Sequence, residues 1–188
     1  MKFRAKNPAL LLIDVQQAFL DDAYWGGNRN NRDAEEVCGQ LLRQWRTLGL
    51  PLVHIRHSSA NPASKLHATS AGFAFHEAVQ PLEGEKVITK SVNSAFIGTH
   101  LDDLLKKESI KTLVIAGITT NHCVSTTTRM AGNMGYDTFV ISDATAAFDR
   151  IGVKGEKYGA ELIHWTALAN LNEEFATVWD SKELFRQL

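Results

Sequence analysis

Residues 112–116 read TLVIA, and residues 117–123 continue with GITTNHC. The first five form a near-continuous apolar run, which is typical of a strand buried on both faces in a parallel sheet. Gly117 ends this run, and a helix is predicted from about His122 to Met134. The segment is therefore a buried strand that leads through a glycine turn into a helix.

The same alternation of strand and helix extends over the rest of the chain. Residues 9–14 form a second apolar run, and apolar positions spaced three and four apart predict an amphipathic helix over about 33–48, which Gly49 and Pro51 stop. In chain order, further strands are predicted at 52–55, 86–89, 138–142 and 176–179, with a helix at about 158–175 before the last of them. The alternation predicts a parallel sheet with helices on both faces, which places functional residues beyond the carboxyl ends of the strands.

Length and composition predict one domain over residues 1–188. The chain is 44% hydrophobic and 22% charged, which excludes collagen-like, low-complexity and wholly disordered classes. Its formal net charge of −1 gives no electrostatic footprint for nucleic acid or an anionic membrane. We therefore expect a small-molecule substrate or a protein partner.

The N-terminus resembles a secretory signal, but its apolar run is too short. Basic residues precede residues 9–13, and Asp14 then interrupts the run. No other run approaches the roughly 18 apolar residues of a membrane span, and the chain's 2 cysteines are too few for a disulfide framework. These observations predict a cytoplasmic protein.

Cys123 is the first candidate for chemistry. Asn121 is a suitable N-cap, so Cys123 is expected in the first turn of the following helix. There the helix dipole and unpaired N–H groups would favour the thiolate, lower the pKa of Cys123 and offer an oxyanion cradle. Cys38 lies on the apolar stripe of helix 33–48 and is predicted to be a core residue. Position alone leaves an inert thiol at Cys123 as an equal alternative.

A nucleophilic cysteine usually needs a base, and two strand ends supply candidates. His122 is a poor partner because adjacent helical residues point about 100° apart. Asp14 and Lys90 each end a predicted strand, so both can reach the crevice that holds Cys123. Lys90 would stabilise the thiolate, and Asp14 would take the thiol proton and return it to a leaving amine. Without the cysteine, a helix cap or surface acid would explain Asp14, and a solvated strand end would explain Lys90.

Three motifs together resemble the isochorismatase-like cysteine hydrolases. They are LIDVQ at 12–16, TKSVNSAF at 89–96, and GITTNHCV at 117–124, continuing to Arg129. They occur in the family's order and span most of the chain. The resemblance implies an α/β fold of three layers, α/β/α, with a mostly parallel, Rossmann-like central sheet.

The resemblance also implies a set of site residues. It gives an Asp-Lys-Cys triad at Asp14, Lys90 and Cys123, a cis peptide bond between Ile118 and Thr119, and an oxyanion hole formed by the N–H groups of Thr119 and Cys123. It further implies a homo-oligomer.

The activity that follows is cleavage of an amide or ureido C–N bond in a small molecule, through a thioester on Cys123 and without a cofactor. The isochorismatases that give the family its name lack the cysteine and cleave a vinyl ether, so Cys123 favours amide hydrolysis. Two alternatives stay open. One is a catalytically silent member that binds a ligand or partner, and the other is an isochorismatase-type hydrolase with a non-amide substrate.

Four histidines raise the question of a metal: His54, His57, His67 and His76. In a strand, residues three apart lie on opposite faces, so at most one of His54 and His57 can face a shared ion. The family's nicotinamidase branch binds metal through Asp-x-His and a further His, whereas residues 56–59 here are RHSS. We predict no metal, and nicotinamide becomes a less favoured substrate.

The substrate pocket is predicted from residues near the motifs. Phe19, Trp25 and Phe96 would form its apolar lining, although packing in the core or at an interface explains them equally well. Asn93 would bind substrate or orient Lys90. The loops at 20–31 and 57–85 are predicted to set specificity.

Overall fold

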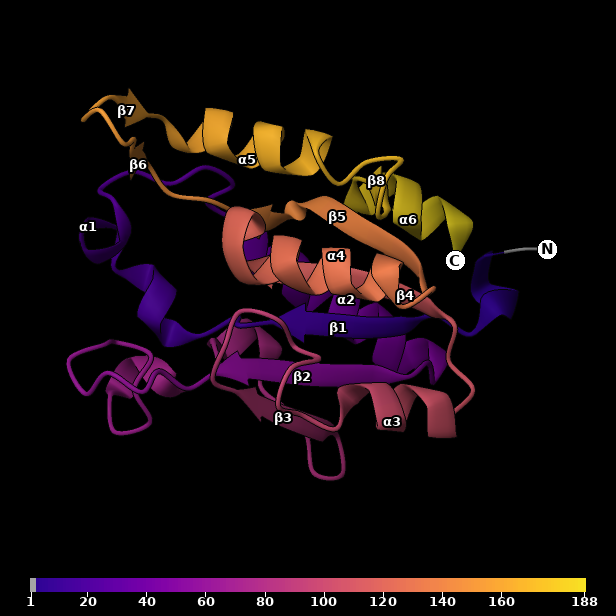
Figure 1. Ribbon diagram of the computed structural model, residues 1–188. Coiled ribbons are helices and arrows are strands. Elements are labelled where there is room, and N and C mark those ends of the chain that lie inside the picture. Colours follow the sequence, from indigo (N-terminus) through magenta and orange to yellow (C-terminus); the bar gives the residue numbers. More distant parts are fainter. Residues whose placement is uncertain (1–2) are drawn as a thin grey trace.

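Six parallel strands form the central sheet of the computed structural model, which describes residues 3–188 (Figure 1). They are β1 (Ala9–Ile13), β2 (Leu52–His57), β3 (Lys86–Lys90), β4 (Thr112–Ile118), β5 (Asp137–Ala146) and β8 (Thr177–Trp179). Their order across the sheet is β3-β2-β1-β4-β5-β8, and every ladder is parallel. The predicted parallel sheet is confirmed.

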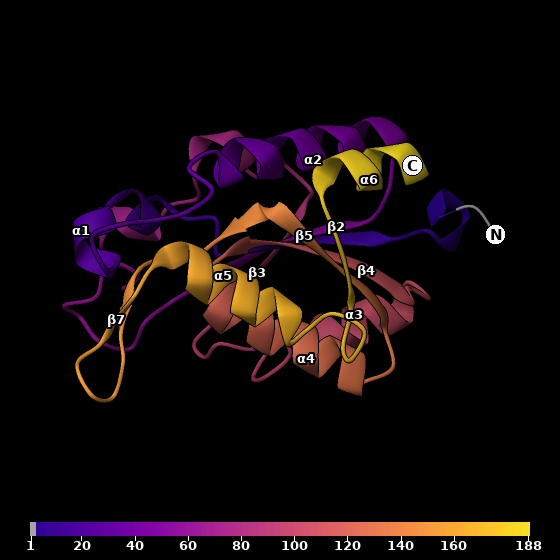
Figure 2. The same cartoon turned by 90° about the horizontal axis from the view of Figure 1, so that it is seen from above.

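Helices cover both faces of this sheet, as Figure 2 shows from above. The α-helices are α1 (Asp22–Trp25), α2 (Ala34–Leu48), α3 (Leu101–Lys107), α4 (Ser125–Asn133), α5 (Ala160–Ala169) and α6 (Ser181–Gln187). One face holds α2 and α6, and the other holds α3, α4 and α5. The three-layer α/β/α arrangement is therefore confirmed.

Shorter elements complete the chain. Within residues 3–188 the 3-10 helices are η1 (Phe3–Lys6), η2 (Gln17–Leu20), η3 (Ala71–Phe73) and η4 (Glu77–Val79). A π-helix, η5 (Thr120–Val124), precedes α4, and a hairpin consists of β6 (Arg150–Ile151) and β7 (Lys157–Tyr158).

Apolar packing on both faces explains why β1 is a continuous apolar run. Successive strand side chains point to opposite faces. Leu11 and Ile13 pack in the core beneath α3 and α4, whereas Leu10 and Leu12 pack against α2. All five β1 residues are buried, so each strand position contributes to one core or the other.

The α2 helix ends as its sequence predicts. Gly49 adopts the left-handed conformation with φ 63°, which glycine reaches without a steric cost, and its N–H bonds the last turn. Cys38 on this helix is fully buried, and its thiol donates to the Ala144 carbonyl at 3.3 Å. The prediction that Cys38 is a core residue is confirmed.

The topology opens a crevice beside β1. From β1 the chain builds outward to β2 and β3, then returns to place β4 on the other side of β1. Ligands bind outside the carboxyl ends of parallel strands at such a switch point. Here α1, the β6–β7 hairpin and the connection between β2 and β3 gather at those ends, and η1 and α6 lie at the opposite end (Figure 1).

Gly117 allows β4 to approach β1 closely at this crevice. Its φ is +129°, and a Cβ there would lie 1.9 Å from the carbonyl oxygen of Ile13. We expect Gly117→Ala to lower the free energy of unfolding by at least about 3 kcal/mol, because the clash is with backbone and the backbone angle is also strained. Urea denaturation measures this loss.

Gly84→Ala is the matched control for that substitution. Gly84 has φ +85°, but a Cβ there meets nothing within 4 Å. Its loss should be limited to backbone strain of about 1 kcal/mol. Equal losses in the two variants would contradict the close-approach argument.

Several boundaries differ from the sequence prediction. The helix predicted over 158–175 begins at Ala160 and ends at Ala169, because residues 170–176 turn back to reach β8. Two seven-residue helices, α3 and α6, were not predicted, although Asp180 caps α6 by accepting from the Glu183 N–H at 2.7 Å. Among residues 3–188, no helix is both long and apolar enough to span a membrane.

Candidate active site

Asp14, Lys90 and Cys123 meet at the carboxyl ends of three strands. Asp14 follows β1, Lys90 ends β3, and Cys123 lies in η5 after β4. The Lys90 Nζ donates to Asp14 Oδ2 at 2.6 Å, and the exposed fractions of these side chains are 0% and 1%. The Cys123 Sγ, an Asp14 carboxylate oxygen and a His57 ring nitrogen all lie within 4.8 Å of one another. The structure thus brings together the three residues that the motifs single out.

Asp14 sits where the chain leaves the sheet. Its φ of 52° is left-handed, a region that Asp and Asn tolerate better than most residues. Its N–H still donates to the Ile55 carbonyl at 2.8 Å, while its own carbonyl accepts from the Gln16 N–H at 2.8 Å. The turn therefore takes the chain out of β1 directly at the carboxylate.

The thiol of Cys123 is protonated in the resting site. Burial raises its pKa to about 12, and the negative charge of Asp14 adds to that effect. Burial also raises the pKa of Asp14, although the Lys90 ammonium acts in the opposite direction. The predicted lowering of the Cys123 pKa is wrong, because desolvation and the neighbouring carboxylate outweigh any effect of the helix end.

One oxygen of Asp14 is placed to accept a proton. Lys90 occupies Oδ2, whereas Oδ1 is buried and makes no hydrogen bond within residues 3–188. The thiol of Cys123 donates only weakly, to Asn93 Oδ1 at 3.8 Å. The carboxylate therefore holds an unused acceptor beside a thiol that still carries its proton.

We expect the alkylation rate of Cys123 by iodoacetamide to keep rising above about pH 9, whereas an ordinary thiol levels off near its pKa of about 8.5. Asp14→Asn should shift the profile to lower pH, because the Asp14 charge raises the pKa of Cys123. Lys90→Met should shift it to higher pH, because Lys90 lowers that pKa. Mass spectrometry of the cysteine peptides measures the alkylation rate of Cys123 in each protein, with the core residue Cys38 as internal comparison. A plateau at or below about pH 8.5 in the unmodified protein would contradict the protonated resting state.

His57 lies just beyond a predicted strand, a position that marks candidate site residues, although the sequence analysis weighed in detail only a metal-ligand role for it. It ends β2 in register with Lys90 on β3, and its Nδ1 lies 3.3 Å from the Lys90 Nζ. Burial and the Lys90 charge lower the pKa of His57, so the ring is neutral at neutral pH and can accept from Lys90. Gln16 fixes the backbone of His57 by accepting from its N–H and donating to its carbonyl.

The structure does not bring the four histidines together. His54 bonds Glu85, His67 bonds Thr69, and His76 accepts from the Ala78 N–H. Only His57 reaches the site, in the triangle with Asp14 and Cys123. Because the Lys90 ammonium bonds both Asp14 and His57, a metal ion held by this triangle would face a like charge.

The π-helix that holds Cys123 begins at Thr120, with Thr119 as its N-cap. The Ile118–Thr119 peptide bond is cis, and the Thr119 carbonyl accepts from the N–H groups of both His122 and Val124. Asn121 is not the N-cap that the sequence predicts, because Thr119 takes that position and the helix is a π-turn. The Asn121 amide instead lies 3.3 Å from His122 Nε2.

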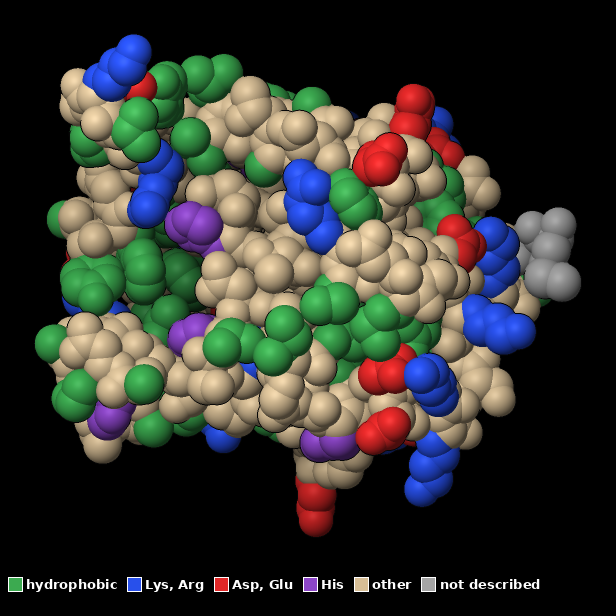
Figure 3. Space-filling view, in the orientation of Figure 1, with side chains coloured by type: hydrophobic (Ala, Val, Ile, Leu, Met, Phe, Trp, Pro, Cys, Tyr) green, Lys and Arg blue, Asp and Glu red, His purple; other side chains and the backbone are tan. Residues whose placement is uncertain are grey.

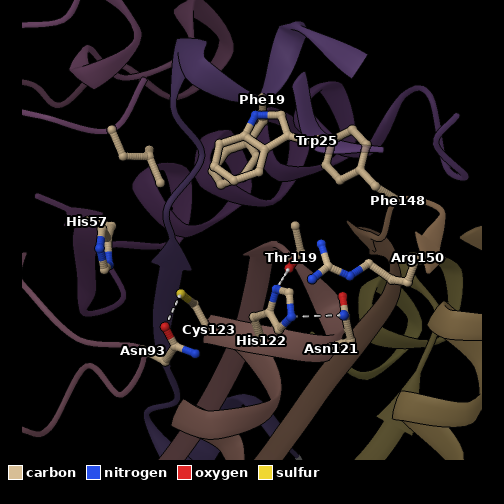
Figure 4. Close-up of a pocket in the computed structure, with 11 residues that line it drawn as sticks. Phe19, Trp25, His57, Asn93, Thr119, Asn121, His122, Cys123, Phe148 and Arg150 are labelled. Carbon is tan, nitrogen blue, oxygen red and sulfur yellow. Dashed lines mark hydrogen bonds between the residues drawn. The ribbon is translucent and has the colours of Figure 1, made fainter. Parts of the chain in front are cut away.

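A pocket of about 330 Å³ lies above the thiol (Figure 4). Its aromatic side is formed by Phe19, Trp25 and Phe148, and the rings of Phe19 and Trp25 stack at 4.7 Å. The Trp25 indole is fixed by a 2.8 Å bond to the Ala18 carbonyl. The remaining lining residues are His57, Leu66, Asn93, Thr119, Asn121, His122, Cys123 and Arg150. Figure 3 shows the corresponding hollow, bordered by hydrophobic and histidine side chains.

The predicted pocket residues separate into two groups. Phe19, Trp25 and Asn93 line the pocket as predicted. Phe96 does not, because its ring stacks on Tyr136 at 5.8 Å and packs against the core. Phe148 and Arg150 were missed, because Phe148 lies between β5 and β6, Arg150 begins β6, and no motif marks either position.

The long loops contribute less lining than predicted. Within the connection from 57 to 85, only His57 and Leu66 line the pocket, and the segment 20–31 supplies Trp25.

Comparison with known proteins places this site in a family. A family model described as the isochorismatase domain matches residues 8–183. The chain belongs to the isochorismatase family. The resemblance inferred from the three motifs is therefore confirmed, and this isochorismatase-family chain is a hydrolase by its family.

Three similar proteins cover nearly the whole isochorismatase-family chain. An uncharacterized isochorismatase family protein of Bacillus subtilis (strain 168), YrdC, is 50% identical over 179 residues, which are 95% of each chain. A crystal structure of a putative isochorismatase-family hydrolase from Chromobacterium violaceum is 43% identical, with a TM-score of 0.94, over 100% of this chain and 96% of that one. Nicotinamidase 3 of Arabidopsis thaliana is 29% identical over 98% of this chain and 90% of its own.

Proposed function

We propose that this isochorismatase-family protein is a cysteine hydrolase that cleaves an amide or ureido C–N bond in a small molecule. The observation that supports it best is the buried triad, in which the Cys123 thiol faces a carboxylate that Lys90 holds by one oxygen. A binding module has no need of a thiol, an acid and a cation at three strand ends. Likeness to a relative named as a nicotinamidase supports the same class of bond.

The first half of the proposed reaction forms a thioester. Asp14 Oδ1 takes the thiol proton as the Cys123 Sγ attacks the carbonyl carbon of the substrate. The resulting oxyanion is stabilised by the N–H groups of Thr119 and Cys123, and one such donor typically contributes about 3 to 4 kcal/mol to the transition state. Asp14 then gives its proton to the departing nitrogen as the C–N bond breaks.

The second half returns the enzyme to its resting state. Water attacks the thioester carbonyl while Asp14 takes a proton from it, and the collapse of the second tetrahedral intermediate releases the acid. The proton then returns to the Cys123 sulfur. A carboxyl group whose pKa is raised by burial suits both directions of this transfer, and the Lys90 ammonium remains beside it throughout.

An acyl-enzyme on Cys123 is the direct test. A panel of small primary amides and N-carbamoyl compounds is screened for ammonia release, and active mixtures are quenched in acid for intact-mass analysis. We expect a mass increase equal to the acyl group, located on the Cys123 peptide and removed by hydroxylamine. Turnover with no adduct on Cys123 under these conditions would contradict the thioester route, and absence of turnover across the panel would favour the silent binder or a non-amide substrate.

A homo-oligomer is proposed from the surface of α5. Most residues of this helix are apolar, and Leu162 and Trp165 are 53% and 55% exposed. A helix of this kind is normally buried, so a second copy of the chain packed on α5 would remove the exposed apolar surface from water. Sedimentation velocity will report whether the chain sediments above the mass of one copy.

A further inference from the structure

Arg150 brings a positive charge to the pocket from outside the triad. It begins the β6–β7 hairpin, and its side chain extends beside Asn121 and His122 toward Thr119 (Figure 4). The residue before it, Asp149, is nearly buried and accepts from the Ala160 N–H at 2.8 Å and from the Asn28 amide at 3.1 Å. The start of the hairpin is therefore held in place before any ligand binds.

The guanidinium of Arg150 makes no ion pair within residues 3–188. No Asp or Glu lines the pocket, and the acid beneath it, Asp14, is already paired with Lys90. His57 and His122 are neutral at neutral pH, since burial lowers the pKa of each and the charge of Lys90 or Arg150 lowers it further. The pocket therefore has a net positive charge, located at Arg150.

The rest of the pocket restricts the ligand in two ways. At about 330 Å³ it is near the lower end of the range for small-molecule sites, about 300 to 1,000 Å³. Phe19, Trp25 and Phe148 form a continuous aromatic side, which favours a flat or apolar body. Asn121 and His122 form the polar side next to Arg150.

We propose that the substrate is a small anionic amide whose carboxylate is bound by Arg150 while its scissile carbonyl lies over Cys123. This inference rests on the proposed cysteine hydrolase function, and it specifies the class of compound. The planar guanidinium fork matches a carboxylate with two parallel N–H donors, which gives orientation as well as attraction. A carboxylate held at the hairpin also directs the remainder of the molecule toward the thiol.

The test uses two alkylating probes that differ in charge. N-(iodoacetyl)glycine has a carboxylate, and N-(iodoacetyl)glycinamide is its neutral counterpart. With each, the Cys123 sulfur forms a bond to the CH₂ carbon, iodide leaves with the electron pair of the C–I bond, and the thiol proton passes to solvent. The ratio of the two rate constants measures the preference of the pocket for an anion, and the same ratio for free cysteine is the reference.

We expect this ratio to exceed that of free cysteine and to fall about tenfold in Arg150→Gln, which loses a charge-assisted hydrogen bond. Arg150→Glu should reverse the preference. Lys154→Gln is the matched control, because it removes a charge from the same hairpin at a residue outside the pocket lining, and it should leave the ratio unchanged. An unmodified protein that matches free cysteine, or a preference that survives in Arg150→Gln, overturns the proposal.

Salt provides a second measurement that does not depend on any variant. The Arg150 side chain is exposed, so raising ionic strength from about 0.05 M to about 0.5 M should lower the ratio in the unmodified protein. A ratio that does not respond to salt also overturns the proposal.

These measurements separate the two proposals because alkylation needs no turnover. A ratio that depends on Arg150, in a protein that forms no acyl adduct with any amide, supports the anion site and rejects the hydrolase. Adducts from neutral amides, with a ratio indifferent to Arg150, support the hydrolase and reject the anionic substrate.

Discussion

Cys123→Ala should lower kcat/KM for amide hydrolysis by at least about 10⁴-fold, because removing a nucleophile that acts with a base eliminates the covalent route. The fold should persist, since the Cys123 side chain lines the pocket and supports only one edge of the core. Ammonia release and circular dichroism measure the two effects. The variant should also bind an amide substrate without forming the acid-stable adduct.

Cys38→Ala is the matched control for that prediction. Cys38 lies on α2, and its fully buried thiol donates to the Ala144 carbonyl on β5. Its loss should cost about 1 to 2 kcal/mol of stability and leave kcat/KM within about twofold, because no reacting group is touched. Activity retained by Cys123→Ala would exclude a thioester at Cys123.

The strands were predictable because a strand that is buried on both sheet faces needs an apolar residue at nearly every position. Residues 9–13 and 112–118 are buried at every position, so their apolar runs contain no helical period that could mislead. The turn at Gly117 was also predictable, because a glycine directly after an apolar run is typical of a strand end. The structure explains the glycine, since its positive φ and its close contact with the Ile13 backbone leave no room for a side chain. Strand ends in a parallel sheet converge, which placed Asp14 and Lys90 near Cys123.

The wrong predictions concern properties that depend on the residues packed around a side chain in the folded protein. Asparagine is a preferred N-cap residue, but Thr119 takes the N-cap position and Asn121 lies inside the π-helix. Phe96 was predicted to line the pocket because it follows Lys90 closely in the sequence. Its ring instead stacks on Tyr136, a contact that this spacing cannot predict. The pKa of Cys123 depends on the depth of the site and on Asp14, neither of which a local motif encodes.

Arg150 and His57 were missed for different reasons. Arg150 reaches the pocket from a hairpin whose path is fixed by tertiary contacts of Asp149 with Asn28 and Ala160. His57 did have a signal, because it ends a strand in register with Lys90. The strand end therefore marked His57 as a candidate, but its role beside the lysine was not predicted, because only a metal role was weighed for it.

Lys90→Met should lower the free energy of unfolding by about 3 to 5 kcal/mol near neutral pH and abolish hydrolysis. Methionine nearly preserves the volume, but it leaves the Asp14 carboxylate buried without its partner, which is costly. Lys106→Met is the control, because Lys106 makes a 2.6 Å pair with Asp102 at the surface. The loss of such a solvent-screened pair should change the stability far less. Urea denaturation of both variants gives the comparison.

The deficit of Lys90→Met should grow with pH. Without Lys90, which lowers the pKa of Asp14 in the intact site, that pKa lies still further above its unfolded value of 3.8. Stability from a raised pKa is fully present below the unfolded pKa and is lost as pH rises through the folded pKa. Unfolding measured at about pH 5 and about pH 8 should therefore show the larger loss at the higher pH.

The double variant Asp14→Asn/Lys90→Met separates the cost of an unpaired charge from the loss of packing. Asparagine tolerates the left-handed backbone at this position, and removing both charges leaves no buried ion at positions 14 and 90. The double variant should regain most of the stability and lose the extra pH dependence, yet remain inactive because it has no base for the thiol. If the double variant were as unstable as Lys90→Met at both pH values, the loss of stability would arise from packing around Lys90. The ion pair with Lys90 would then not be what holds Asp14 in place beside Cys123.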